Sequence, residues 1–262
     1  MEKFCYITND NKSFETNIVE IDERKVKWAT GTVTYKVLNG SRSFPNNTFE
    51  SKALVVALRQ WGFRTKDVKF RKERTDKEAD ITLKFTKKED DKLFKEKPSV
   101  LAYAYFPTTS KIGGNITFND SYVWSTNGKG ISGKKAKQLG LADPRTDDNI
   151  SIKTYNIIHT LIHECGHAIG LKHQEACNEC VMYPYYNKKV ILHDLGDRNY
   201  YVNGVEKSLS PDKINEYKSQ NIPIFPTEMA HDVDRIQVMY GKREISRRVI
   251  DYFRARLLRN YT

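Results

Sequence analysis

The chain of 262 residues carries 44 Lys and Arg against 33 Asp and Glu, a formal net charge of +11, and 39% of its residues are hydrophobic. This apolar content excludes a disordered chain, and the length allows one large domain or two small ones. No zinc knuckle, RNA-binding signature or basic leucine zipper accompanies the positive charge, so we expect no specific nucleic-acid partner. The sequence also lacks the roughly 18 consecutive apolar residues of a transmembrane segment.

The N-terminal residues give little indication of where the protein acts. The first ten, MEKFCYITND, lack the apolar core of a secretory signal peptide. This favours a cytoplasmic protein by default and leaves open release by lysis or by a non-standard route. Residues 1–27 are predicted to be a polar N-terminal extension with weak β-strand character over residues 4–8 and 18–21.

The next part of the chain has the patterns of a sheet. Alternating or β-branched residues predict strands over residues 32–38, 68–70, 79–85, 100–106 and 115–118. Residues 48–61 carry apolar side chains at the spacing of an amphipathic helix. The charged residues 86–97 and the Gly-, Lys- and Asp-rich residues 125–149 are predicted to be loops. Strands that come first and are followed by helices favour a mixed α+β fold.

Residues 163–173 read HECGHAIGLKH and place His163, Glu164, His167, Gly170 and His173 in the pattern H-E-x-x-H-x-x-G-x-x-H. Side chains four apart leave the same face of a helix, so His163 and His167 can bind one metal ion. Gly170 can adopt the positive φ that ends a helix, which lets the chain supply His173 as a third ligand. Three His ligands leave a fourth position for water, as in a catalytic zinc site, and Glu164 can act on that water without being a ligand.

The helix that carries this motif is predicted to follow Ser151 as its N-cap. Cys165 lies on a different face from the His ligands and is predicted to be a small core residue. Cys177 and Cys180 form a single C-x-x-C with no second pair, so a closed structural zinc site is not expected. Two reduced thiols or one local disulfide both fit this pattern.

Beyond the zinc motif, the chain resembles the matrixins, the matrix-metalloproteinase family of the metzincin zinc proteases. The resemblance is carried by Trp28 with TVTY at 32–35, LAYAYFP at 101–107, GG at 113–114 through Trp124, VMYPYY at 181–186 and DVDRIQVMYG at 232–241. It implies an α+β metzincin-type domain: a mixed five-stranded twisted sheet with an active-site helix, a Met-turn and a C-terminal helix.

The resemblance also implies roles for single residues. Met182 would be the methionine of the Met-turn, an apolar platform beneath the zinc, and Asp232 would brace that turn from the last helix. Leu101 and Ala102 would offer backbone groups to an extended peptide, which adds to the sheet edge as a strand. The pocket for the side chain after the cleaved bond would be lined by three residues: His159, Pro184 and Tyr186.

Departures from the family pattern predict a simpler set of metals. The family places His ligands of a structural zinc where this chain has Tyr103 and Thr117, neither a good zinc ligand. Calcium-binding positions that are usually acidic are Asn115, Asn119 and Tyr122. We therefore expect one catalytic zinc and neither a structural zinc nor a calcium site. We also expect neither an inhibitory pro-segment with a cysteine switch nor a hemopexin-like repeat.

Three segments follow from these patterns. Residues 28–241 are predicted to be the catalytic domain, ending in a helix from Thr227 to Gly241, with an insertion at 188–227 that lacks a strong period. Residues 1–27 precede it. Residues 242–262 form a basic, amphipathic tail that we expect to pack on the domain as a helix, with contact to an anionic surface as the alternative.

The sequence predicts a monomeric zinc endopeptidase that acts on protein or peptide substrates, with Glu164 as the general base. One alternative is an archaemetzincin-like aminopeptidase, because that group shares the H-x-x-x-C-x-x-C-x-M spacing found at residues 173–182. Another is a catalytically silent, basic binding module that retains the site as a relic.

Overall fold

The computed structural model describes residues 4–8, 26–29, 31–44, 48–62, 64–108, 110–126, 128–177, 180–186, 198–202, 205–209, 216 and 224–242. Within these residues no helix is both long and apolar enough to cross a membrane. Of the predicted tail helix over residues 242–262, only Lys242 falls among the described residues.

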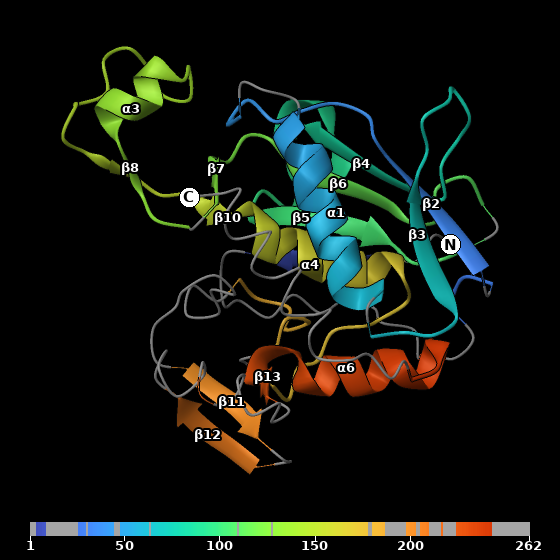
Figure 1. Ribbon diagram of the computed structural model, residues 1–262. Coiled ribbons are helices and arrows are strands. Elements are labelled where there is room, and N and C mark those ends of the chain that lie inside the picture. Colours follow the sequence, from blue (N-terminus) through green and yellow to red (C-terminus); the bar gives the residue numbers. More distant parts are fainter. Residues whose placement is uncertain are drawn as a thin grey trace.

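A twisted sheet forms the centre of the fold, with strand order β1-β5-β6-β4-β2-β3 (Figure 1). The strands are β1 (Phe4–Thr8), β2 (Gly31–Val37), β3 (Val68–Lys72), β4 (Ile81–Thr86), β5 (Val100–Tyr105) and β6 (Asn115–Asn119). Strands β3, β2, β4 and β6 run parallel, and β5 is antiparallel to β6. The predicted mixed five-stranded sheet is therefore confirmed, and β1 joins it as a sixth strand.

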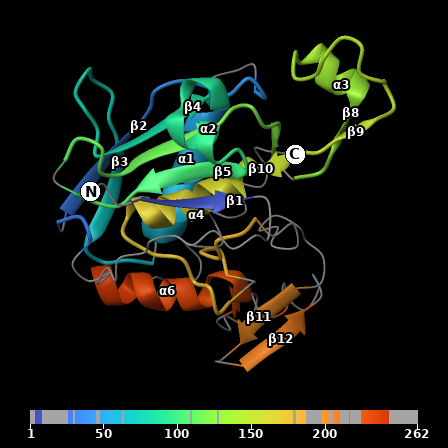
Figure 2. The same cartoon turned by 180° about the vertical axis from the view of Figure 1, so that it is seen from behind.

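Strand β1 pairs along the outer edge of β5, antiparallel to it, and both strands contact helix α4 (Figure 2). Cys5 pairs with Ala104 and Ile7 pairs with Ala102, and the register shifts between Ile7 and Thr8. The weak β character of residues 4–8 thus becomes a strand when it finds an open sheet edge, because the edge supplies the backbone partners that the segment alone lacks.

Two helices, α1 (Thr48–Gly62) and α4 (Ile157–Ala168), pack against each other on one face of the sheet (Figure 1). Trp61 joins them, since its side chain is fully buried and its Nε1 donates to the carbonyl of Ile162 at 3.0 Å. Helix α6 (Thr227–Tyr240) lies below α4, and the Tyr240 hydroxyl donates to the carbonyl of Ile169 at 2.8 Å. These contacts fix α4 between α1 and α6.

Two segments predicted to be loops contain helices. Residues 86–97 include a 3₁₀ turn (Lys88–Asp90) and helix α2 (Lys92–Glu96), which is capped because the Asp91 side chain accepts from the amides of Leu93 and Phe94. Residues 125–149 include helix α3 (Gly133–Gln138), and it projects from the body of the molecule (Figure 1). Both helices are highly charged and too short to show an apolar period, and each begins at one capping side chain, Asp91 for α2 and Ser132 for α3.

Shorter strands complete the described structure. Strands β7 (Trp124–Ser125) and β10 (Tyr155–Asn156) pair in parallel, and β8 (Ile131–Ser132) pairs with β9 (Ser151–Ile152) at the base of α3. In the predicted insertion at 188–227, β11 (Arg198–Val202), β12 (Val205–Leu209) and β13 (Ile224–Pro226) form a small antiparallel sheet next to α6.

Candidate metal centre and active site

The helix that carries the zinc motif starts later than the sequence predicted. Asn156, not Ser151, is its N-cap: the Asn156 Oδ1 accepts from the amides of Ile158 at 2.9 Å and His159 at 3.1 Å. Ser151 belongs instead to β9, and β10 intervenes before the helix. The cap was available in the sequence, since Asn ranks with Ser as an N-cap, but the short β10 pairing that selects it was not.

His163 and His167 project from the same face of α4, as their spacing requires, and their Nε2 atoms lie 3.0 Å apart. Gly170 follows the helix with a φ of +108°, which turns the chain back. His173 then joins the pair, so that one ring nitrogen from each of the three residues lies within 4.8 Å of the others. The predicted ligand set is therefore assembled at one point.

The outer nitrogen of each helical ligand is held by a backbone carbonyl. His163 Nδ1 lies 2.6 Å from the carbonyl oxygen of Val181, and His167 Nδ1 lies 2.6 Å from that of Leu171. A carbonyl oxygen can only accept, so both rings carry their proton on Nδ1 and direct the Nε2 lone pair toward the shared point. This donor set and its backbone partners fit a zinc ion.

Burial keeps these imidazoles neutral. Removal from water lowers the pKa of His163 to about 3, with a smaller lowering from His173 and an opposing effect of the Val181 carbonyl. Burial likewise lowers the pKa of His167 well below its usual value. A metal ligand must be the neutral imidazole, so the site is prepared for a cation at neutral pH.

Glu164 is fully buried in α4 beside His163. The neighbouring Cys165 is also fully buried and contributes to the hydrophobic core, as predicted. Burial raises the pKa of the Cys165 thiol well above its usual value, so this side chain is a packed apolar group and not a thiolate.

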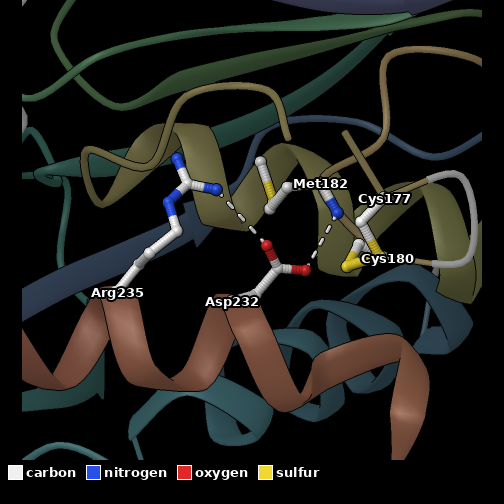
Figure 3. Close-up of a disulfide and its surroundings, with 5 residues drawn as sticks. All are labelled: Cys177, Cys180, Met182, Asp232 and Arg235. Atoms are coloured by element: carbon white, nitrogen blue, oxygen red, sulfur yellow. Dashed lines mark hydrogen bonds and ion pairs between the residues drawn. A yellow bond between two sulfur atoms is a disulfide. The ribbon is translucent and has the colours of Figure 1, made fainter. Parts of the chain in front are cut away.

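A tight turn at residues 180–183 lies beneath the ligands. Met182 is fully buried, and the Cys177–Cys180 pair just before it is a disulfide, one of the two states that the sequence allowed (Figure 3). The amide of Gln174, next to His173, donates to the carbonyl of Met182 at 2.8 Å. A backbone hydrogen bond therefore links the turn to the residue after His173, in addition to the covalent segment that carries the disulfide.

Aromatic side chains gather at the N-terminal end of α4. Tyr186 packs edge-on against His159, with ring centroids 5.7 Å apart, and against Tyr155, with centroids 5.2 Å apart. Its hydroxyl accepts the amide of Asn156 at 2.8 Å. Pro184 lies nearby in the sequence and is half-buried. The structure thus brings together His159 and Tyr186, two of the three residues predicted to line a pocket.

Strand β5, which was predicted to be the edge of the sheet and lies between β1 and β6, holds the other predicted substrate-binding residues. Leu101 and Ala102 are fully buried, and Ala102 pairs with Ile7 of β1. The edge that was predicted to receive a peptide therefore carries a strand of the same chain.

Tyr103 and Thr117, which stand where the family places His ligands of a structural zinc, are both buried. Tyr103 donates from its hydroxyl to Asp91 Oδ2 at 2.9 Å and stacks at a tilt on Phe94, with centroids 5.4 Å apart. Its neighbour across the sheet is Thr117, which is also buried. Burial raises the pKa of Tyr103, so it remains a hydroxyl donor. The role of Asp91 was not predicted, although an Asp directly before a short apolar run is a helix-capping signal.

The positions matched to calcium ligands make polar contacts within the protein. Asn115 Oδ1 accepts from the hydroxyl of Thr82 at 2.7 Å. Asn119 Nδ2 donates to the carbonyl of Val100 at 3.2 Å. The Tyr122 hydroxyl donates to the carbonyl of Pro98 at 2.6 Å. Each of these three side chains thus forms a hydrogen bond that links two neighbouring strands or loops.

Comparison with known proteins agrees with this arrangement. The family model described as Matrixin matches residues 27–199. The chain is 27% identical over 177 residues to Matrix metalloproteinase-2 of Drosophila melanogaster, covering 67% of this chain and 20% of that protein. It is 27% identical over 224 residues to Matrilysin of Homo sapiens, covering 85% and 61%. It is 28% identical over 172 residues to Matrix metalloproteinase-25 of Homo sapiens, covering 62% and 26%. The chain spans less than two thirds of the length of each of these relatives.

Proposed function

Because the chain belongs to the matrixin family, we propose that it is a zinc-dependent endopeptidase whose one zinc ion is held by three ligands: His163, His167 and His173. The observation that carries this proposal is the convergence of their ring nitrogens within 4.8 Å, at the buried face of the helix that also bears Glu164. A zinc ion bound there would polarise the scissile carbonyl and lower the pKa of a bound water to about 7.

Glu164 is the general base of the proposed reaction. It takes a proton from the attacking water and passes it to the leaving amine, so both protonation states of one carboxylate are used in each cycle. Its position directly after His163 on α4 keeps it beside the ligands without making it one of them. The surrounding burial strengthens its electrostatic effect on the reacting groups.

The peptide substrate is proposed to bind in an extended form along β5, with backbone hydrogen bonds near Leu101 and Ala102. The side chain after the cleaved bond would enter a pocket walled by His159, Tyr186 and Pro184. The aromatic rings of His159 and Tyr186 favour an apolar or aromatic side chain at that position. Since β1 occupies the same edge of β5, substrate binding requires that β1 leave it.

The direct test is cleavage of a library of N-terminally blocked peptides by protein of measured zinc content. Wild-type protein is expected to bind one zinc per chain and to cut peptides internally without added calcium. Glu164→Ala should bind zinc equally and lose at least about 1000-fold in rate. Glu175→Ala removes an exposed carboxylate two residues after the last ligand and should cut like the wild type.

The outcomes separate the candidate functions. Normal cleavage by Glu164→Ala would contradict the mechanism. Activity on free but not on blocked N-termini would favour an aminopeptidase. Stoichiometric zinc with no cleavage of either kind would favour a silent binding module.

A further inference from the structure

The Cys177–Cys180 disulfide lies in the segment that joins two parts of the proposed metal site. This segment starts at Gln174, directly after the ligand His173, and ends at Met182 in the turn beneath α4. Its two ends are held together by the hydrogen bond from the Gln174 amide to the Met182 carbonyl. The disulfide closes a smaller ring inside this loop and lies beside Met182 (Figure 3).

The residue that follows the disulfide holds the first ligand. Cys180 is bonded directly to Val181, whose carbonyl accepts Nδ1–H of His163 at 2.6 Å. Within the ring, the amide of Cys180 donates to the carbonyl of Cys177 at 3.1 Å. A cross-link between the two cysteines removes conformational freedom from the backbone that sets the direction of the Val181 carbonyl.

Helix α6 contacts the same turn, as the family resemblance implies. The amide of Met182 donates to Oδ2 of Asp232 at 3.1 Å (Figure 3). Val181 therefore lies between a residue held by α6 and a residue held by the disulfide. Only the second of these restraints is a bond that a chemical reductant can open.

The two cysteines differ in their exposure to solvent. Cys177 is half-buried, whereas Cys180 is 2% exposed. A disulfide is opened when an external thiolate attacks one of its sulfurs, and access decides which sulfur is attacked. An external thiol therefore reaches Cys177 first.

We propose that the Cys177–Cys180 disulfide is a redox-sensitive positioning element, which holds the Val181 carbonyl against His163 and loosens the hold on zinc when it is reduced. The acceptor at Nδ1–H fixes the orientation of a ligand imidazole, and loss of such a partner weakens metal binding. With the ring open, residues 177–180 gain freedom and that acceptor is less well fixed. This inference rests on the proposed zinc site and adds a form of control to it.

The reductant in this step is a dithiol. One of its thiolates attacks Sγ of Cys177, forms a mixed disulfide and releases Cys180 as a thiolate, which takes up a proton. The second thiolate of the reductant then attacks the reductant's sulfur in the mixed disulfide and releases Cys177, which is protonated in turn. One S–S bond is broken in the protein and one is formed in the reductant, so the protein gains two electrons and two protons.

The test compares the oxidised and reduced forms of the full chain. Metal-free protein is reduced with excess dithiothreitol, separated from it under argon and then given zinc. Alkylation followed by mass spectrometry should count two more thiols in the reduced form. Competition with a chromophoric chelator should show zinc affinity about tenfold weaker for the reduced form, and reoxidation should restore the original value.

A double variant, Cys177→Ser with Cys180→Ser, controls for the remaining cysteines. It keeps Cys5 and Cys165, so any effect of reductant on those thiols persists in it. Its zinc affinity should equal that of the reduced wild type and should not respond to dithiothreitol. Far-UV circular dichroism verifies that it is folded; if it is not, the comparison of the two wild-type forms decides alone.

Thermodynamic linkage provides a readout that local stability alone would not change. If the disulfide tightens zinc binding tenfold, zinc must favour the disulfide over the dithiol by the same factor. The reduction potential of the Cys177–Cys180 pair should then fall by about 30 mV when zinc is bound. Titration in thiol–disulfide buffers, without zinc and at a fixed free zinc concentration, measures this difference.

Each outcome decides between definite alternatives. Equal zinc affinity in the two forms, or a potential that zinc does not change, would overturn the inference. Tighter zinc binding after reduction, with a potential raised by zinc, would also overturn it, because the thiols would then act as ligands. Failure of both wild-type forms to bind zinc would overturn the proposed site itself.

Discussion

The backbone of Gly166 lies directly against the sulfur of Met182, leaving no room for a side chain between α4 and the turn beneath it. Any Cβ at residue 166 would also lie 3.3 Å from Trp61, so a side chain there would be confined by Met182 on one side and Trp61 on the other. The third residue after His163 is therefore a glycine for a packing reason, despite the cost of glycine inside a helix.

Gly166→Ala should consequently lower stability by about 1 kcal/mol, because overpacking costs about 1–3 kcal/mol and the gain in helix propensity is about 1 kcal/mol. In a Met182→Ala background the nearer obstacle is removed and only the approach to Trp61 remains, so the same substitution should cost about 1 kcal/mol less and become close to neutral. Urea unfolding of the metal-free proteins completes this double-mutant cycle. An identical effect in both backgrounds would show that Met182 is not the obstacle.

The Tyr103–Asp91 hydrogen bond joins β5 to helix α2. Tyr103→Phe removes the donor and leaves Asp91 Oδ2 without this partner in a buried site, which should lower the free energy of unfolding by about 2 kcal/mol. Tyr122→Phe is the matched control, since it removes a hydroxyl bond of 2.6 Å to Pro98 at an exposed place and should cost less than about 0.5 kcal/mol. Equal losses in the two variants would mean that burial of the hydrogen bond is unimportant.

Glu50, in the first turn of α1, is a fully buried carboxylate. Its Oε1 accepts the amide of Ser41 at 2.8 Å, and among the described residues its Oε2 has no hydrogen-bond partner. Burial raises the pKa of Glu50, the nearby Asp120 raises it further, and the Ser41 amide opposes them. The folded state therefore binds this proton more tightly than the unfolded state.

A raised folded pKa contributes stability that is fully present below the unfolded pKa, near 4.5, and is lost as the pH rises. Glu50→Gln should accordingly stabilise the protein by about 1 kcal/mol at pH 7 and have little effect near pH 4. Exposed Glu89→Gln should change neither value. Urea unfolding at the two pH values measures the difference, and a loss of stability at pH 7 for Glu50→Gln would show that the charged form is the favoured one.

Whether the sequence predicted a feature of this structure depends on how far apart in the chain the interacting residues are. The ligand pair His163 and His167 could be predicted because the helix itself sets their spacing. The turn to His173 needs only the local conformational freedom of Gly170. The core strands followed from their own alternation.

Features that depend on distant partners were not predicted. Arg235 contacts Lys172, 63 residues earlier, and no local pattern marks that pair. Ser151 was a reasonable cap, but pairing of β10 with β7 moved the start of the helix to Asn156. The docking of residues 4–8 onto β5 also depends on an edge roughly 100 residues away in the chain.

That docking leads to a prediction about activity. If a peptide substrate adds to β5, it competes with β1 for the same backbone groups beside Ala102 and Ala104. Deletion of residues 1–8 should then lower KM several-fold with little change in kcat, because the deleted strand affects substrate binding and not the ligands or Glu164. The same deletion combined with Glu164→Ala is the background control and should remain inactive.

A synthetic peptide of residues 1–10 added to the deleted protein should inhibit it competitively, since it can return to the open edge. A scrambled peptide of the same composition controls for non-specific effects and should inhibit less, because strand pairing requires the side chains to fit the register as well as the backbone. An unchanged KM after deletion would show that substrate binds without displacing β1, which would place the peptide elsewhere than on the edge of β5.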